Sequence, residues 1–163
     1  MLVFVRALTY AILFISLFLI YVPTHILSRF GYVRPAAFEI QQIIAVIVGT
    51  TGAAIAVWCI LTFATIGKGT PAPFDPPQKL VIEGPYRFVR NPMYVGASLA
   101  LTGAAIFYQS WFLFSYAAFF FLVSHLFVVF YEEPVLRRTF GDDYEVYCNK
   151  VKRWWPGLHC NSS

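Results

Sequence analysis

The chain has 163 residues, which fits one domain, and 59% of them are hydrophobic, 19% aromatic and only 12% charged. A soluble domain carries roughly 25% charged residues, so this composition excludes an ordinary water-exposed surface and predicts an all-α integral membrane protein. The net charge is +4, but the charges flank apolar runs and form no stripe. We therefore expect a lipid bilayer as the surroundings and no nucleic-acid partner. The three cysteines follow no CxxC pattern, so we expect neither a disulfide nor a metal site.

Two apolar runs open the chain. The first spans residues 7–28 and is long enough to cross a bilayer. A signal peptide is the alternative, but no A-x-A-like site follows the run, which favours a retained transmembrane helix. The second, residues 40–67, predicts a tilted transmembrane helix. Its small residues four apart predict close packing against another helix; they are Gly49 with Ala53 and Gly52 with Ala56.

A polar, proline-rich segment, residues 67–91, separates these runs from the rest. Its five prolines prevent a regular helix before Pro92, which suits a first helical turn with Asn91 as the N-cap. The next 39 residues carry no Lys, Arg, Asp or Glu and are too long for one crossing. They predict two tightly paired helices, about 93–108 and 110–132, that form a hairpin.

The remaining segment, residues 132–163, is charged and aromatic. Apolar residues at steps of three and four predict an amphipathic helix at the membrane interface, broken at Gly141. Lys and Arg gather in residues 67–92 and in this tail, whereas the hairpin turn has none. The apolar runs thus predict about four transmembrane helices, and the positive-inside rule places both charged segments and the amphipathic helix on the cytoplasmic side. We expect the membrane to be a bacterial inner membrane, because the chain is short.

The two charged segments should therefore meet on one membrane face. Together they offer anion-binding donors, carboxylates and aromatic rings, which suits a zwitterionic, ring-bearing small molecule. Simpler readings stay open: Arg87 and Arg90 as membrane anchors, the Glu132-Glu133 pair as a solvated helix end, and His125 as a packing residue. The pattern Gly67-Lys68-Gly69 follows no strand and is no Rossmann fingerprint.

Two ordered motifs carry a family resemblance. The first is Arg90-Asn91-Pro92-Met93-Tyr94, and the second comprises Glu132-Glu133, Phe140-Gly141, Tyr144, Tyr147 and Pro156. Over about residues 67–157 the chain resembles the isoprenylcysteine carboxyl methyltransferase and phospholipid methyltransferase superfamily of membrane enzymes. One membrane domain, 1–163, would then comprise N-terminal helices (1–66) and a methyltransferase core (67–157).

The resemblance implies S-adenosylmethionine as the cofactor and a lipid-soluble methyl acceptor that enters from the bilayer. Asn91 stands where the isoprenylcysteine enzymes carry histidine, so the acceptor stays open between a prenylcysteine-like carboxylate and a phospholipid amine. Reaction roles would fall to Glu132, Arg137 and Arg138. Cofactor contacts would fall to Gly67, Gly69, Tyr86, Arg87, Arg90, Asn91, Pro92, Tyr94, His125, Glu132, Glu133 and Tyr144. The alternatives are a membrane NADPH-dependent reductase of the sterol-reductase type and a non-enzymatic membrane scaffold.

Overall fold

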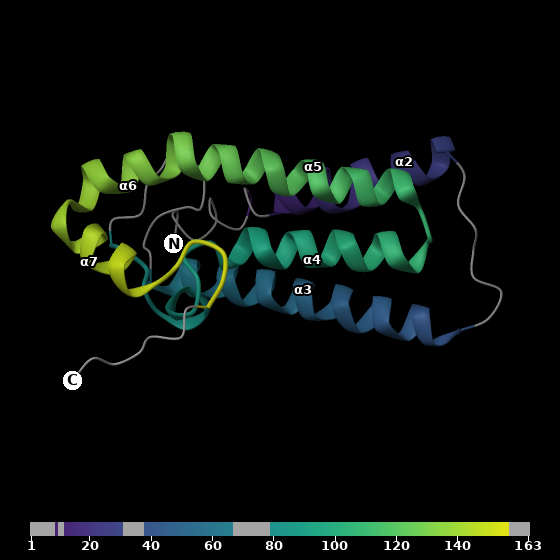
Figure 1. Ribbon diagram of the computed structural model, residues 1–163, viewed down its shortest axis with the longest axis horizontal. Coiled ribbons are helices and arrows are strands. Elements are labelled where there is room, and N and C mark those ends of the chain that lie inside the picture. Colours follow the sequence, from purple (N-terminus) through teal and green to yellow (C-terminus); the bar gives the residue numbers. More distant parts are fainter. Residues whose placement is uncertain (1–8, 10–11, 31–37, 67–78, 157–163) are drawn as a thin grey trace.

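The computed structural model describes residue 9 and residues 12–30, 38–66 and 79–156. Within these ranges every regular element is a helix and none is a strand, which confirms the all-α prediction (Figure 1). In chain order they are η1 (Ile15–Tyr21), α2 (Val22–Phe30), α3 (Ile40–Ile66), η2 (Gly84–Arg87), α4 (Pro92–Phe107), α5 (Trp111–Phe127), η3 (Val128–Glu132), α6 (Glu133–Phe140) and α7 (Asp142–Lys150).

Among the described residues, three continuous helical stretches are long and apolar enough to cross a membrane: Ile12–Phe30, Ile40–Phe63 and Trp111–Phe140. Helix α4 is also apolar but has only 16 residues, about 24 Å at 1.5 Å per residue. The predicted transmembrane character is therefore confirmed, whereas the count of four crossings stays a prediction.

Helices α3 and α4 pack with their backbones in direct contact. A Cβ atom added at Gly52 would lie 2.5 Å from the backbone nitrogen of Ala100, and one at Gly103 would lie 2.5 Å from the nitrogen of Gly49. Only glycine fits at such positions, because any side chain would displace the neighbouring backbone. The small residues thus bring the two helices together as predicted, in surroundings where lipid removes the hydrophobic drive for helix association.

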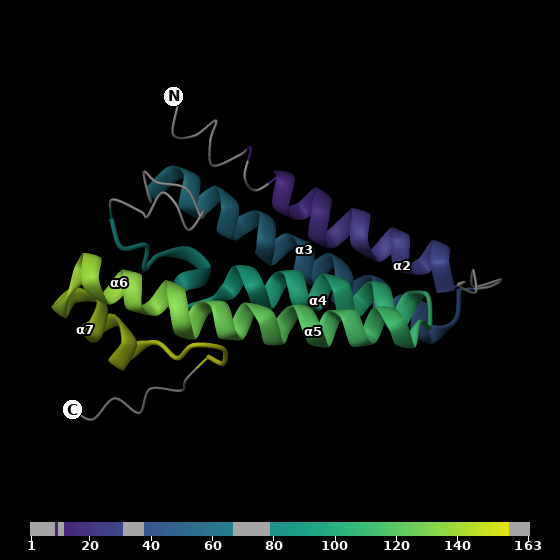
Figure 2. The ribbon, with the colours of Figure 1, turned by 90° about the horizontal axis from the view of Figure 1, so that it is seen from above.

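The hairpin of α4 and α5 forms as predicted, with a turn at residues 108–110. The Ser110 hydroxyl accepts a hydrogen bond from the Leu113 nitrogen at 3.4 Å and caps α5. Between the helices, Ala97, Leu101 and Phe120 form a buried core. Figure 2 shows α2 along the outer side of this bundle.

The fold differs from the prediction at two helix boundaries. Asn91 stands at the N-cap of α4, but its side chain does not cap that helix; its amide Nδ2 instead donates to the carbonyl oxygen of Arg153 at 3.4 Å. The second hairpin helix does not end at residue 132. It passes through the π-helical turn η3 and continues as α6 to Phe140.

Gly141 then breaks the tail, as predicted. It has a φ of +51°, a left-handed conformation that favours glycine, and it separates α6 from α7. Because of this reversal, α7 folds back toward the start of α4, and the described parts of the two charged segments, residues 79–92 and 132–156, lie at the same end of the bundle (Figure 1). The cytoplasmic location of this end stays a prediction.

Candidate active site

The segment before α4 is held in place by backbone contacts. Gly84 has a φ of +59°, and a Cβ atom there would lie 2.9 Å from the Thr62 hydroxyl oxygen on α3. The turn η2 that follows buries Tyr86, whose carbonyl oxygen accepts a hydrogen bond from the Tyr147 hydroxyl at 2.7 Å. This turn therefore joins α3 on one side and α7 on the other.

Arg90 and Asn91 lie where this segment meets the C-terminal strap, by which we mean residues 151–156. The Arg90 backbone nitrogen donates to the Lys152 carbonyl oxygen at 2.9 Å. The Arg90 guanidinium contacts the Cys148 sulfur through Nη1, which also lies 3.5 Å from Oε1 of Glu133. Its Nε is buried and has no hydrogen-bond partner within the described part of the chain.

Glu133 is only 6% exposed and is paired with two arginines. Nε of Arg153 donates to its Oε1 at 2.7 Å, and Nη2 of Arg153 donates to its Oε2 at 2.9 Å. This bidentate contact is a strong, geometrically specific form of ion pair. We call Arg90, Glu133, Cys148 and Arg153 the polar cluster.

Glu132 has different surroundings. Its Oε2 accepts a hydrogen bond from the Tyr94 hydroxyl on α4 at 3.3 Å. No ion pair of Glu132 is found among the residues that the structure describes. Tyr94 and Glu132 are 38 positions apart in sequence and are brought together by the α4–α5 hairpin. This pair is a carboxylate with a neutral partner, close to the polar cluster in sequence but distinct from it.

Two further tyrosines surround the polar cluster. Tyr144 and Tyr147 of α7 are buried, with ring centroids 6.2 Å apart. Burial raises the pKa of both hydroxyls well above the usual tyrosine value. They therefore stay protonated at neutral pH and can act as hydrogen-bond donors.

The remaining predicted site residues are less closely joined to the cluster. Arg87 and Arg138 are exposed. Arg137 is also exposed, pairs with Glu145 and lies over the Tyr144 ring, 6.0 Å from its centroid. Pro92 is buried at the first turn of α4. Gly67 and Gly69 lie outside the described residues.

His125 contacts the strap. Its Nδ1 accepts a hydrogen bond from the indole nitrogen of Trp154 at 3.0 Å, and Trp154 also packs on Phe121. The face of α5 that carries Phe121 and His125 is therefore in contact with the strap, and the packing role considered for His125 describes its observed contacts.

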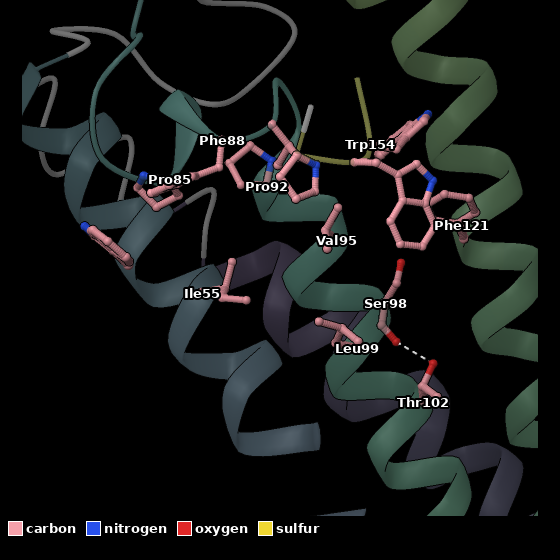
Figure 3. Close-up of a pocket in the computed structure, with 14 residues that line it drawn as sticks. Ile55, Pro85, Phe88, Pro92, Val95, Ser98, Leu99, Thr102, Phe121 and Trp154 are labelled. Atoms are coloured by element: carbon pink, nitrogen blue, oxygen red, sulfur yellow. Dashed lines mark hydrogen bonds between the residues drawn. The ribbon is translucent and has the colours of Figure 1, made fainter. Parts of the chain in front are cut away.

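An apolar groove of about 560 Å³ is lined in part by neighbours in sequence of the polar residues described above (Figure 3). Its walls come from α3, the segment before α4, α4 from Pro92 to Thr102, α5 and the strap. They are Ile55, Trp58, Pro85, Phe88, Val89, Pro92, Val95, Ser98, Leu99, Thr102, Phe121, Trp154, Trp155 and Pro156. The volume falls within the roughly 300–1,000 Å³ that is usual for small-molecule sites.

Groove residues and site residues alternate along the chain. Val89 and Pro92 line the groove, whereas Arg90 and Asn91 between them make the polar contacts; Trp154 lines the groove and Arg153 binds Glu133. An amphiphilic ligand, with a charged end and a hydrocarbon part, matches such a two-sided wall.

Ser98 and Thr102 place hydroxyl groups in the wall of the groove. The Ser98 Oγ is buried without a hydrogen-bond partner within the described ranges, and in Figure 3 it points toward Phe121 and Trp154. The Thr102 hydroxyl is satisfied, since it donates to the Ser98 carbonyl oxygen at 2.8 Å.

Sequence reasoning missed three contributors to this region: Cys148, Arg153 and Trp154. A buried glutamate requires a cation, and that requirement was the one available signal for Arg153. The tail offers several basic residues, however, and spacing alone does not select Arg153 over Arg137 or Arg138. The structure pairs Glu133 with Arg153.

Comparison with known proteins agrees with this arrangement. A family model described as phospholipid methyltransferase matches residues 40–143, which is more than half of the chain. The match begins with α3, covers the α4–α5 hairpin and includes Arg90, Tyr94, Glu132 and Glu133. No curated protein matches the sequence. The chain belongs to the phospholipid methyltransferase family.

Proposed function

We propose that this protein transfers a methyl group from S-adenosylmethionine to a lipid-soluble acceptor at the cytoplasmic face of the membrane. One observation carries the proposal: an apolar groove adjoins a buried arginine N–H and a carboxylate for which the described residues supply, respectively, no partner and a single phenol. The family assignment supports methyl transfer to lipid-like molecules.

The residues fit the cofactor. S-adenosylmethionine is a zwitterion with an adenosine ring, and when bound it supplies a methyl group on a sulfonium. The unsatisfied Nε of Arg90 would donate to its carboxylate, which removes the cost of a buried orphan donor. Glu132 would accept from its amino group or ribose hydroxyls, with Tyr94 holding the carboxylate in position.

The chain's main contribution to the reaction is positioning in a water-poor site. The hairpin fixes Glu132 relative to Tyr94, and the strap fixes Arg90 through its backbone. The groove would hold the hydrocarbon part of the acceptor, so that its reactive group lies at the polar end. The acceptor is a phospholipid amine or a prenylcysteine-like carboxylate, and both carry such a hydrocarbon part.

The test is titration of the purified protein in detergent with S-adenosylmethionine and, separately, with NADPH. We expect binding of S-adenosylmethionine alone. Arg90→Ala and Glu132→Gln should each weaken it about tenfold or more, the effect of losing one charge-assisted hydrogen bond. Lys79→Ala, which removes an exposed cation from the segment before α4, is the matched control and should bind as the wild type does. Binding of NADPH without S-adenosylmethionine would overturn the proposal and favour a reductase.

A further inference from the structure

Glu132 and Glu133 are adjacent in sequence but face different partners. Successive residues of a helix point about 100° apart, because one turn takes 3.6 residues. Glu132 therefore reaches Tyr94 on α4, whereas Glu133 reaches Arg153 in the strap. The π-helical turn η3 ends at Glu132. Turns of this kind are frequent at functional sites of proteins.

The charges within the polar cluster do not balance. Two guanidinium groups, of Arg90 and Arg153, surround the one carboxylate of Glu133. Arg153 binds both carboxylate oxygens at 2.7 and 2.9 Å, whereas Arg90 lies 3.5 Å from one of them, and its buried Nε has no partner among the residues that the structure describes. The spare positive charge in the cluster therefore resides on Arg90.

We infer that Arg153 is a positioning residue: by binding both oxygens of Glu133 it keeps the Nε of Arg90 available for an anionic ligand group and leaves Glu132 as the carboxylate that contacts the ligand. The inference rests on the proposed function and divides the two glutamates between roles. Glu133 is the internal counter-ion, and Glu132 faces the ligand's cationic or hydroxyl groups. The cofactor's amino-acid end offers both an anion and a cation.

The physical reason lies in the cost of a buried charge. Glu133 is 6% exposed, so its carboxylate requires a cation. If the Arg153 guanidinium is removed, the nearest remaining cation is Arg90, which already lies 3.5 Å away. Glu133 would then draw in the Arg90 guanidinium, whose Nη1 is already 3.5 Å away, and the Nε would no longer be available to a ligand. Loss of Arg153 should thus weaken ligand binding although Arg153 itself does not touch the ligand.

A purely structural role for Arg153 makes a different prediction. The strap also contacts Arg90, Asn91 and His125, so the Glu133–Arg153 pair would in that case only anchor the strap. Removing Glu133 in addition to Arg153 would then bring no recovery. If Arg153 acts by restraining Glu133, removing both charges should free Arg90 again.

The experiment measures S-adenosylmethionine affinity of the full chain in detergent for the wild type, Arg153→Gln, Arg153→Lys and the double variant Glu133→Gln/Arg153→Gln. We expect Arg153→Gln to weaken binding about tenfold or more. Arg153→Lys, which keeps the charge but not the bidentate contact, should fall between it and the wild type. The double variant should recover most of the lost affinity.

The inference is overturned if the folded double variant binds no better than Arg153→Gln, or if Arg153→Gln binds as tightly as the wild type. Failure of the wild type to bind S-adenosylmethionine would instead refute the proposed function. In that case the role of the Glu133–Arg153 ion pair is tested by comparing the apparent melting temperatures of Arg153→Gln and the double variant. A double variant that melts above Arg153→Gln supports the restraint of Glu133, and one that melts at or below it contradicts it.

Discussion

Along the α3–α4 interface, Gly49, Gly52, Gly96 and Gly103 bring backbone against backbone, whereas at the Arg90 end of the bundle side chains from distant parts of the chain meet. The first contact depends on the absence of side chains and carries no charge. The second depends on charge: Arg90 and Cys148 are 58 positions apart, and Arg153 and Glu133 are 20 apart. Side-chain size should therefore determine the stability of the α3–α4 interface. Side-chain charge should determine ligand binding at the Arg90 end of the bundle.

The largest effect is expected from added volume at the interface. Gly52→Leu would push side-chain atoms into the backbone of Ala100 and Gly96, where even a Cβ atom has only 2.5 Å. Overpacking of this kind costs about 3 kcal/mol or more in the free energy of unfolding. The measurement is thermal unfolding in detergent. Gly49→Ala is the control, since its Cβ would lie 3.8 Å from the nearest atom, at Gly103. Equal melting of Gly52→Leu and the wild type would contradict the described packing.

A change of charge without a change of size should spare the fold and lower activity. Glu132→Gln keeps the shape of the side chain and its contact with Tyr94, but removes the carboxylate charge. We expect methyl transfer to fall about 10- to 100-fold, the effect of one hydrogen bond to a charged group, with the melting temperature nearly unchanged. Asp142→Asn, an exposed carboxylate at the start of α7, is the matched control. If both variants lose activity equally, net charge rather than the Glu132 site is responsible.

A smaller and more selective effect is expected in the groove. Leu99→Trp places a larger side chain inside it, so KM for a long-chain acceptor should rise about tenfold while the affinity for S-adenosylmethionine stays the same. Leu122→Trp is the control, because Leu122 is 53% exposed on α5 and does not line the groove. An unchanged KM in Leu99→Trp would remove the groove from the acceptor site.

The smallest effect concerns the strap. Trp154→Phe keeps an aromatic ring against Phe121 but loses the hydrogen bond to His125. The expected loss is about 0.5–1.5 kcal/mol in the free energy of unfolding, as for one neutral hydrogen bond. Trp155→Phe, at a position that is 78% exposed, should lose less. The reverse order would show that the contact between Trp154 and His125 does not stabilise the strap.

The two regions also differ in how far the sequence predicts them. The interface and hairpin are local patterns: small residues four apart and an uncharged run too long for one crossing, so α3, α4 and α5 were predicted to within a few residues of their observed bounds. The tail helix was also predicted, but its continuity with α5 past residue 132 was not, because a π-helical turn leaves no periodic signal.

The polar cluster is less predictable because the tertiary fold determines which of its side chains are in contact. The motifs predicted that Arg90 and Glu132–Glu133 would share one end of the bundle, as observed. Which arginine binds Glu133 depends on where Gly141 and α7 direct the strap, and residue spacing does not encode that path. Arg153 was therefore missed, and the Asn91 side chain was assigned to the wrong hydrogen bond.

The most direct test of the central claim is incubation of the purified protein with methyl-labelled S-adenosylmethionine and a total lipid extract. We predict label in the lipid fraction with the wild type and Lys79→Ala, and a loss of about tenfold or more with Arg90→Ala. Labelled lipid formed equally by the wild type and Arg90→Ala, or a wild type that binds the cofactor and labels no lipid, would contradict the account.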